Sequence, residues 1–429
     1  MLNVLDVFCG AGGFSEGFRQ AGFRIAAGTD VDPDACATYA HNFPDAVAVC
    51  GDLTEEAIRS RVVDAAGAVD VVVGGPPCQA FSQVRNHDRA LNDPRNRLYR
   101  EFLWLLERVQ PRAFAMENVP GLAQLRVQER IAEDLVLDGK YRVSVQEVDA
   151  CDFGVPQTRK RLLFIGLRSS LGACPEVLSG SRASQHLLLA RTENGSVGYQ
   201  PTPSGLDGRR FLRRLLDTRD ASIVTTRQAI SDLAVLRSGR RADDLSAEDL
   251  PPPESAYQRV MRNACAVSNV SVPRINEDTI LRLSAIPEGG NYLDLPHGLR
   301  DRYLTGQRWG PHNGSGRLGR RHYYAYRRLH PDFWAWTLNT KADSTYHWHA
   351  ERALSVREFA RIQSFPDHFK FLTDPRRGPI PGRIPGGAAH SRYRQVGNAV
   401  PPLLALAVAR QLHTLLSSDP VTRNRGASV

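Results

Sequence analysis

The amino-acid sequence predicts an α/β protein, with a doubly wound and mostly parallel sheet joined to a second, smaller and loop-rich domain. Short apolar runs alternate with helical patterns through the first 168 residues, which is the rhythm of strands and crossover helices. The rhythm stops after Arg168, and 429 residues exceed one average domain. Hydrophobic residues at 42% and charged residues at 24% are the proportions of an ordered globular protein.

The first region contains six apolar runs that we expect to form the sheet. They are residues 4–9, 24–30, 47–52, 70–75, 113–118 and 161–167. Helical spacing predicts helices at 57–66, after a cap at Asp52-Leu53-Thr54, and at 98–109. In such a fold the loops that follow the strands meet at the carboxyl edge of the sheet, where ligands bind.

The region that follows is rich in Ser, Gly, Pro and Arg and is expected to be the second domain, at 169–345. A helical pattern returns at 355–363, a Pro/Gly linker follows at 375–387, and a final helix is expected at 401–415. The predicted boundaries are therefore a first domain at 1–168 that 392–416 completes, a hinge and linker segment at 346–391, and a tail at 417–429.

The formal charge of +9 comes almost entirely from arginine, because only four of the 55 basic residues are lysines. Arginine suits bidentate contacts with phosphate and guanine, although the coding bias of a GC-rich genome explains the composition equally well. The seven cysteines are scattered without a CxxC pair, so neither a metal site nor a redox couple is expected. With no signal peptide and no membrane span expected, a reducing cytoplasm fits best.

The loop after the first strand carries the glycines of a nucleotide-binding turn at Gly10, Gly12 and Gly13. Asp30 ends the second strand, 20 residues after Gly10, and is placed to accept hydrogen bonds from ribose hydroxyls. Ser15 departs from a dinucleotide fingerprint, but nicotinamide and adenosylmethionine cofactors both remain compatible. Asp52 follows the third strand and could bind an adenine amino group, although alone it reads more readily as a helix N-cap.

Cys78 lies in the segment Gly74-Gly75-Pro76-Pro77-Cys78-Gln79, at the end of the fourth strand. A lone cysteine is usually an inert buried side chain. A structural cysteine, however, needs no rigid Gly-Pro-Pro platform at the ligand edge of a sheet. We therefore interpret Cys78 as a nucleophile beside the cofactor.

Charged residues follow at the same edge. Glu117 ends the fifth strand, where a carboxylate is costly to bury without a task, although capping the next helix is an alternative. Arg159 and Arg161 are two residues apart and so share one face of an extended segment. They could hold a phosphate or a carboxylate, or they could simply be a solvated charge run.

Six ordered motifs resemble those of bacterial DNA cytosine-5 methyltransferases of the restriction-modification type. They are Asp6-Val7-Phe8-Cys9-Gly10-Ala11-Gly12-Gly13, Pro76-Pro77-Cys78-Gln79, Glu117-Asn118-Val119, Gln157-Thr158-Arg159-Lys160-Arg161, Arg357-Glu358-Phe359-Ala360-Arg361-Ile362-Gln363-Ser364-Phe365-Pro366 and Gln395-Val396-Gly397-Asn398-Ala399-Val400-Pro401-Pro402. The resemblance covers about residues 1–168 and 345–412. A chance match to six motifs in order is negligible, although any one alone would be only suggestive.

This resemblance implies a Rossmann-like fold that binds S-adenosylmethionine, and methyl transfer to C5 of a cytosine flipped out of duplex DNA. Cys78 would attack C6 of the base, Glu117 would act at N3, and Arg159 and Arg161 would hold O2 and the active-site loop. The resemblance also implies a set of cofactor-binding residues. These are Phe8, Ala11, Gly13, Asp30, Val31, Asp52, Leu53, Pro77, Asn398 and Val400. Val31 is smaller than the residue that some relatives place there, which puts the strength of adenine packing in doubt.

DNA contacts are expected in two places. The segment from Gln79 to Arg97, with Ser82 and Arg85, has the composition of a loop that closes over DNA. Sequence recognition would lie between the two arginine-containing motifs, above all in residues 300–343, which interleave arginines with aromatic side chains. Arg317, Arg320, Arg321, Thr337 and Leu338 are the residues that we expect to contact DNA there, although residues 185–241 are an alternative.

Three other functions compete with this interpretation. A nicotinamide-dependent dehydrogenase would share the glycine turn and the ribose acid, but Ser15 and the Pro-Pro-Cys loop count against it. An RNA cytosine-5 methyltransferase would share the catalytic motifs, whereas the long recognition region favours DNA. An inactive DNA-binding regulator is disfavoured because the catalytic side chains are all present. The sequence further suggests a monomer that acts on double-stranded DNA, with a companion restriction endonuclease for the same site.

Overall fold

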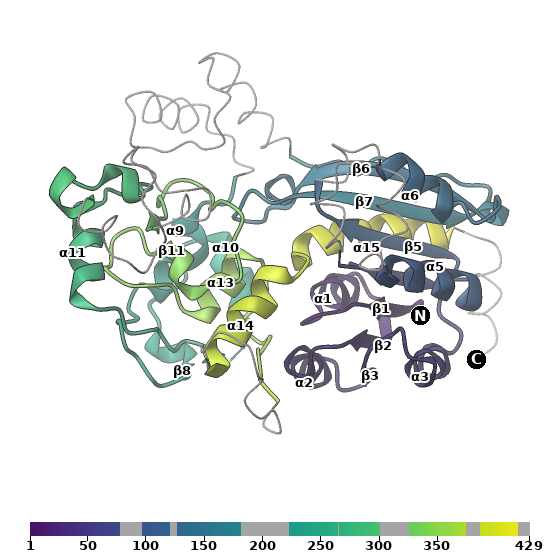
Figure 1. Ribbon diagram of the computed structural model, residues 1–429, viewed down its shortest axis with the longest axis horizontal. Helices are drawn as coiled ribbons and strands as arrows, with labels where there is room; N and C mark the ends of the chain where they lie inside the picture. Colours follow the sequence, from purple (N-terminus) through teal and green to yellow (C-terminus); the bar gives the residue numbers. More distant parts are fainter. Residues whose placement is uncertain are drawn as a thin grey trace, which may run out of the picture. The chain divides into compact units, whose positions relative to one another are not determined.

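The computed structural model describes residues 1–77, 97–120, 127–181, 223–264, 266–300, 326–374 and 387–418. The chain divides into two compact units (Figure 1). The first unit comprises Met1–Phe153, Arg159–Gly180 and Lys370–Val429, and the second comprises Gly154–Thr158 and Ser181–Phe369. Of the segment expected to be a hinge and linker, residues 346–369 therefore lie within the second unit and residues 370–391 within the first.

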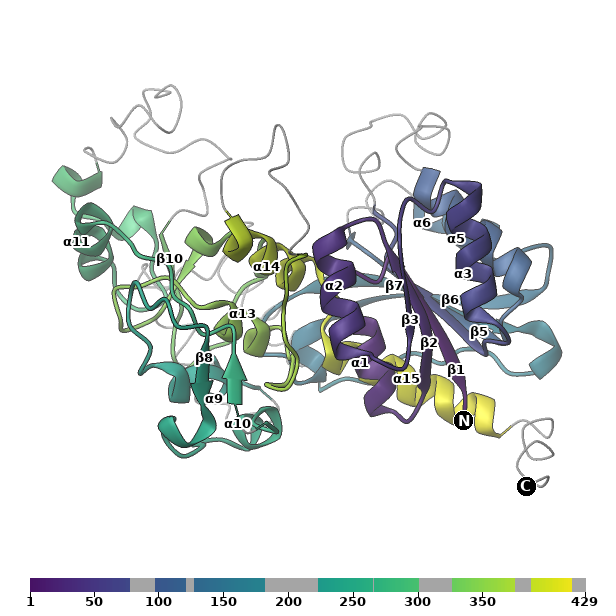
Figure 2. The same cartoon turned by 90° about the horizontal axis from the view of Figure 1, so that it is seen from below.

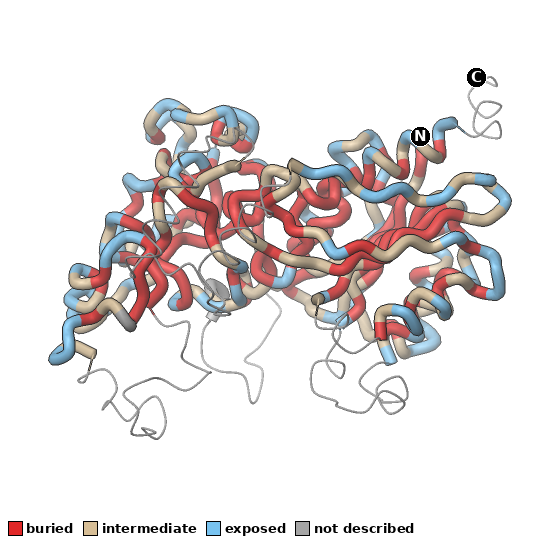
Figure 3. The backbone as a smooth tube through the Cα atoms, turned by 90° about the horizontal axis from the view of Figure 1, so that it is seen from above, coloured by how far each residue is buried: buried red, intermediate tan, exposed pale blue. Residues whose placement is uncertain are grey.

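The first unit is built on a seven-stranded sheet of order β3-β2-β1-β4-β5-β7-β6. Five neighbouring strands are parallel, whereas β7 runs antiparallel to both β5 and β6. The strands are β1 (Asn3–Val7), β2 (Arg24–Asp30), β3 (Val47–Cys50), β4 (Val71–Gly74), β5 (Ala113–Asn118), β6 (Tyr141–Asp149) and β7 (Lys160–Arg168). The central strands are almost wholly buried, as the red tube of Figure 3 shows.

Helices cover both faces of this sheet, as a doubly wound fold requires (Figure 2). On one face α3 (Glu56–Ala66), α5 (Arg97–Val109) and α6 (Val127–Leu135) share a hydrophobic core with the strands. On the other face α1 (Gly13–Gln20) packs along α15 (Pro402–Ser417), and α2 (Pro33–Asn42) connects β2 to β3. A Cβ at Gly17 would lie 2.5 Å from the Ala405 Cβ, so glycine allows the close approach of α1 and α15.

The doubly wound α/β class that the sequence predicts is confirmed, and all six expected strands exist with small shifts in their bounds. One strand was missed. β6 alternates exposed and buried residues at the edge of the sheet, which makes a weak apolar signal. The expected cap of α3 is wrong, since its N-cap residue is Glu55 and makes no side-chain capping bond, while Asp52 accepts from the Thr54 amide within a turn at 2.9 Å.

In the second unit, short elements separate longer irregular segments. Its α-helices are α9 (Thr226–Ile230), α10 (Ala256–Met261), α11 (Glu277–Ala285) and α13 (Val356–Ile362). Two small sheets pair β8 (Asp244–Ser246) with β9 (Ala266–Ser268), and β10 (Arg327–Arg328) with β11 (Thr345–Tyr346). Single 3-10 turns complete the described elements at Ser231–Leu233, Ala247–Asp249, Tyr292–Asp294 and Ala342–Ser344, with two more in the first unit at Ala150–Phe153 and Ser169–Leu171.

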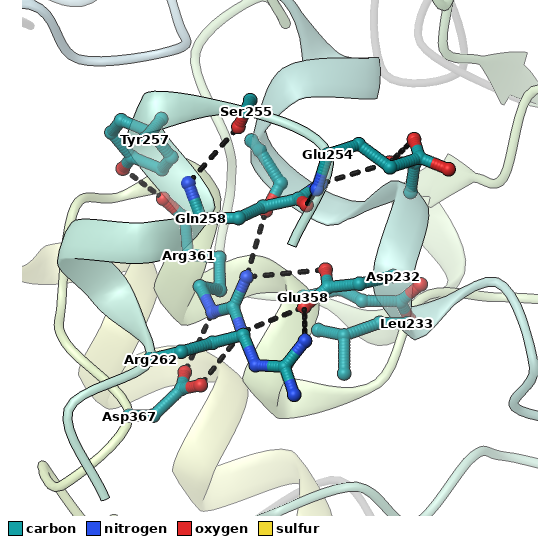
Figure 4. A network of polar contacts seen from close by, with 12 residues as sticks. Asp232, Leu233, Glu254, Ser255, Tyr257, Gln258, Arg262, Glu358, Arg361 and Asp367 are labelled. Atoms are coloured by element: carbon teal, nitrogen blue, oxygen red, sulfur yellow. Dashed lines mark hydrogen bonds and ion pairs between the residues drawn. The ribbon is translucent and has the colours of Figure 1, made fainter. Parts of the chain in front are cut away.

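Helix α13 begins with a capping box between Ser355 and Glu358, and it carries buried charges into the middle of the second unit. Arg361 donates to both carboxylate oxygens of Asp367 at 2.6 Å, and to Asp232 at 3.3 Å (Figure 4). Arg352 makes a bidentate pair with Glu358 at 2.8 Å. These ions are buried at a large desolvation cost, which only such complete pairing offsets.

One stretch, His390–Ser417, is long and apolar enough to cross a membrane by length and composition alone, although the sequence analysis expected none. It spans the end of α14 (Gly387–Asn398) and α15, and 56% of its most apolar window is buried. Leu404, Val408 and Leu412 are fully buried within the first unit. This burial is the pattern of a core helix.

Candidate active site at the carboxyl edge of the sheet

The topology collects most of the predicted site residues at one edge of the first unit. The loops after β1, β2, β3, β4 and β5 all lie at the carboxyl ends of parallel strands. Because β7 is antiparallel, its first residues lie at this edge too, with Asn118 opposite Leu162. Arg159 and Arg161 are thereby brought to the end of β5, an arrangement that the sequence pattern could not reveal.

The glycine loop after β1 has an unusual backbone. Phe8, Gly10 and Gly12 all have positive φ angles, of 58°, 52° and 99°. Gly10 is required by this conformation and not by crowding, since an added Cβ would meet no described atom within 4 Å. The loop leads directly into α1, so its amides are available to a ligand at the edge.

Asp30 fixes this loop as well as facing the edge. One of its carboxylate oxygens accepts from the Gly10 amide at 2.9 Å, and the other accepts from the Asp32 amide at 2.9 Å. Burial raises the pKa of Asp30, and the two amides oppose that rise. Each oxygen keeps a further lone pair, so the carboxylate can still accept bonds from ribose hydroxyls.

The far end of the chain completes the same loop. A Cβ at Gly13 would lie 2.1 Å from the Val400 carbonyl oxygen, so only glycine permits Val400 to approach. Asn398 is exposed at the end of α14, close in sequence to this contact. Two residues that are almost 400 positions apart therefore meet in one site, as the motif resemblance implies.

The remaining predicted cofactor residues differ in what they expose. Val31 is an apolar side chain with 64% of its surface exposed beside Asp30, as a surface for adenine would need. Asp52 and Pro77 also have accessible surface, whereas the side chains of Ala11 and Leu53 are buried, so these two could offer only backbone atoms. Backbone and side-chain bonds from Thr54 lower the pKa of Asp52, which keeps it ionised.

Glu117 forms an ion pair with Arg161 at the end of β5, and the two side chains keep 14% and 11% of their surface exposed. The carboxylate lies beside the loop that follows β4, since a Cβ at Gly75 would be 3.3 Å from its Oε2. The Asn118 side-chain amide donates to the Pro76 carbonyl at 3.3 Å and ties the same loop to β5. The acid and the approach to position 78 are thus held together, and Asn118 is a contributor that the sequence analysis did not single out.

Arg159 occupies a more enclosed position than Arg161. Its backbone amide donates to Asp149 at 2.7 Å and its guanidinium donates to the Gly397 carbonyl at 2.8 Å. Burial lowers the pKa of Arg159, and the charge of Arg161 adds to the effect. The two arginines therefore differ in role: Arg159 joins β7 to the C-terminal segment, and Arg161 meets the carboxylate.

Three thiols near this edge are unsuited to nucleophilic attack. Burial raises the pKa values of Cys9, Cys36 and Cys151 well above that of a free thiol, so little thiolate forms at neutral pH. Cys78 lies outside the described residues. So do five residues expected to contact DNA, namely Ser82, Arg85, Arg317, Arg320 and Arg321.

Thr337 and Leu338 are described, and both lie against the segment that precedes Arg159. The Thr337 hydroxyl donates to the Thr158 carbonyl at 2.7 Å, and the Leu338 amide donates to the Gln157 side chain at 3.2 Å. Thr337 is exposed, whereas the side chain of Leu338 is buried. The structure thus leaves Thr337 a free face, while Leu338 has little side-chain surface for a ligand.

A doubly wound sheet with a glycine turn, a ribose-type acid and an acid–arginine pair at its carboxyl edge defines a nucleoside-cofactor-dependent α/β enzyme. The chain belongs to the C-5 cytosine-specific DNA methylase family, whose profile it matches over residues 2–414. It is accordingly a DNA (cytosine-5-)-methyltransferase, and the family and fold imply S-adenosylmethionine as the methyl donor.

Individual relatives agree with this assignment. The chain is 31% identical to the Type II methyltransferase M.AgeI of Thalassovita gelatinovora, over 97% of this chain and all of the relative. It is also 31% identical to the Type II methyltransferase M1.HphI of Haemophilus parahaemolyticus, over 95% of this chain and 86% of the relative. The fold is similar to that of the S. pombe Dnmt2 methyltransferase, with a TM-score of 0.54, 14% identity and coverage of 97% and 99% of the two chains.

Proposed function

We propose that this enzyme methylates C5 of a cytosine flipped out of a specific duplex sequence, through a covalent bond between Cys78 and C6 of the base. The observation that carries the proposal is the Glu117–Arg161 pair beside Gly75 and Pro76, two residues before Cys78. An acid, a cation and the approach to a thiol converge where the family's chemistry needs them.

The reaction needs covalent activation because C5 of cytosine is a poor nucleophile. Addition of the Cys78 thiolate to C6, with protonation at N3, converts the ring to an enamine whose C5 attacks the methyl group. Glu117 holds the proton at N3, while Arg161 orients Glu117 and is close enough to bind the O2 atom of the base. Loss of the C5 proton to a base then expels Cys78 and restores the aromatic ring.

S-adenosylmethionine supplies an electrophilic methyl group when it is bound. Several features of the edge fit it: the positive-φ glycine loop for close backbone approach, the Asp30 carboxylate for the ribose hydroxyls, and the exposed Val31 for the adenine face. Asp52 would accept the adenine amino group. Phe8, Gly13, Pro77, Asn398 and Val400 would enclose the remainder, with backbone atoms of Ala11 and Leu53.

We further propose that residues 300–343 read the DNA sequence and that the enzyme protects a site cut by a companion endonuclease in a bacterial cytoplasm. Type II methyltransferases among the relatives support the second statement. Exchange of residues 300–343 with the matching segment of a relative should change the methylated sequence, as read by bisulfite sequencing. If exchange of 185–241 changes it instead, the recognition segment is misassigned.

The covalent mechanism is tested with duplex DNA that carries 5-fluorocytosine at the target. Fluorine cannot leave as a proton does, so the wild-type enzyme should form a stable adduct whose tryptic peptide contains Cys78. Cys78→Ser should form no adduct and transfer no methyl group, while it still binds DNA and S-adenosylmethionine. Adduct formation by Cys78→Ser would overturn the assignment, and transfer RNA as a parallel substrate separates DNA from RNA methylation.

A further inference from the structure

A buried tyrosine on α2 contacts three of the segments that form the proposed cofactor site. The ring of Tyr39 is fully buried, and its hydroxyl oxygen lies 2.8 Å from the Ser15 hydroxyl oxygen at the start of α1. The ring also lies against Gly12, where a Cβ would be 3.0 Å from its Cδ2, and against Gly28, where a Cβ would be 2.3 Å from its Cζ. Gly28 is two residues before Asp30, so Tyr39 touches the glycine loop, α1 and the ribose-binding strand.

The direction of the hydrogen bonds is determined by the number of protons. The Ser15 hydroxyl has one proton, which it donates to Asp6 Oδ2 at 2.7 Å. Tyr39 must therefore be the donor to Ser15, and burial raises the pKa of Tyr39 far enough to keep this proton in place. The Ala27 carbonyl at 3.5 Å is a much weaker competitor for it.

This chain of bonds replaces an N-cap that α1 lacks. The N-cap residue is Gly12, which has no side chain to accept from the first amides of the helix. Asp6 on β1 takes that role, because its Oδ2 accepts from the Ser15 amide at 3.1 Å as well as from the Ser15 hydroxyl. Asp6, Ser15 and Tyr39 form a relay that runs from β1 through the start of α1 to α2, behind the loop that faces the edge.

We propose that Tyr39 is a positioning residue for the methyl donor, which holds the Gly10–Gly13 loop in its binding conformation through Ser15 and Asp6. Tyr39 touches no reacting atom. The inference rests on the cofactor site proposed above, and it assigns a function to Ser15, which in the sequence stood out only as a departure from a dinucleotide fingerprint. Gly28 is accounted for as well, as the position that leaves room for the ring.

The principal test is Tyr39→Phe, which keeps the ring and removes only the donor. Ser15 then loses a buried partner, so we expect the dissociation constant for S-adenosylhomocysteine, measured by calorimetry, to rise about three- to tenfold. The KM for S-adenosylmethionine should rise by the same factor, while kcat at saturating donor stays within about twofold. A fall in kcat without a change in KM would overturn the proposal.

Tyr141→Phe is the matched control. Tyr141 is a buried tyrosine of the same unit, and its hydroxyl donates to the Pro111 carbonyl at 2.8 Å, at the amino end of β5 and so at the opposite edge. Both variants lose one buried hydroxyl bond and should lose similar thermal stability. Only Tyr39→Phe should weaken donor binding, and equal weakening in both would reduce Tyr39 to a general structural role.

Two further variants locate the effect in the relay. Ser15→Ala and Tyr39→Phe break the same connection, so the double variant should bind no more weakly than Ser15→Ala alone, whereas additive losses would contradict the relay. Asp6→Asn keeps an acceptor oxygen and should retain affinity that Asp6→Ala loses. Failure of the wild type to bind the donor would refute the proposed function, whereas unaltered binding by Tyr39→Phe would refute only this inference.

Discussion

Arginine–carboxylate pairs occur in both compact units, but they are built differently. In the second unit the side chains of Arg361 and Asp367 are fully buried, and every guanidinium nitrogen of Arg361 donates to a described acceptor. At the sheet edge of the first unit, Glu117 and Arg161 retain accessible surface beside a glycine. The first arrangement has no capacity for another partner, whereas the second can exchange an internal contact for a substrate.

The contrast shows why motif residues of the same type need not have the same role. The motif at 357–366 and the motif at 157–161 both supply arginines, and the sequence alone does not distinguish them. Burial and completeness of hydrogen bonding do. Arg357 donates to the carbonyls of Ser268, Pro366 and Phe369, so it organises the second unit from within.

The largest effect is expected at the edge pair. Glu117→Gln removes the acid that holds the proton at N3, so kcat for methyl transfer should fall by about 10²- to 10⁴-fold with little change in the free energy of unfolding. Glu101→Gln is the matched control, because Glu101 pairs with Arg59 at 2.6 Å on the helical face of the same unit. Full activity of Glu117→Gln in a labelled-methyl assay would remove Glu117 from the mechanism.

The buried pair should show the opposite behaviour. Asp367→Ala leaves the Arg361 charge without its main partner, so the free energy of unfolding should fall by about 3–5 kcal/mol in urea titrations. Asp332→Ala is its control, since Asp332 pairs with Arg227 at 3.0 Å with about half of each side chain exposed. An exposed pair contributes about 0–1 kcal/mol. Equal losses in the two variants would show that burial is not the deciding difference.

How much of this could be read from the sequence follows the same division. The apolar strands and the loops that end them predict the sheet and its ligand edge, because a parallel α/β fold places strand ends together. The pairing of Glu117 with Arg161 was not predictable, because it depends on β7 running antiparallel between β5 and β6. Tyr39 was missed because a tyrosine within an apolar helical pattern reads as ordinary core.

The second unit was harder to predict for a physical reason. Its described helices are short and derive their stability from caps and buried ions more than from a long apolar stripe, so hydrophobic periodicity carries little signal. The caps themselves are visible, as in Thr225 and Gln228 or Ser355 and Glu358, and they could have located two of these helices.

A smaller effect is expected at Asp30, whose carboxylate both fixes the loop and faces the ribose. Asp30→Ala removes these bonds, and charge-assisted hydrogen bonds contribute about 1.5–3 kcal/mol each, so the dissociation constant for S-adenosylmethionine should rise by at least about tenfold. DNA affinity and the methylated sequence should not change. Calorimetry that gives a wild-type constant would place the ribose contact elsewhere.

The smallest and last prediction uses pH to separate the two units. Burial raises the pKa of Asp6 in the first unit to about 7, against 3.8 ordinarily, with the nearby Asp30 charge contributing. Between these values the folded state holds a proton that the unfolded state has released, so Asp6 makes stability fall as the pH rises toward 7.

Burial lowers the pKa of His347 in the second unit to about 3, and its Nδ1 accepts from the His349 and Ala350 amides at 3.1 Å, which excludes a proton there. Below pH 6.5 the unfolded imidazole gains a proton that the folded one refuses, so His347 makes stability fall as the pH drops. Glu358, Arg352, Arg328 and His349 are the charged or titratable neighbours of His347.

Unfolding titrations of the wild type, Asp6→Asn and His347→Gln between pH 5 and 7.5 should therefore give differences of opposite slope, each up to about 1.4 kcal/mol per pH unit. The stability of Asp6→Asn relative to the wild type should rise with pH, because the wild type alone loses the protonated carboxyl. That of His347→Gln relative to the wild type should rise as the pH falls, because the wild type alone refuses the proton. Parallel slopes would mean that other groups, such as Asp149 in the first unit or Asp232 in the second, dominate the titration.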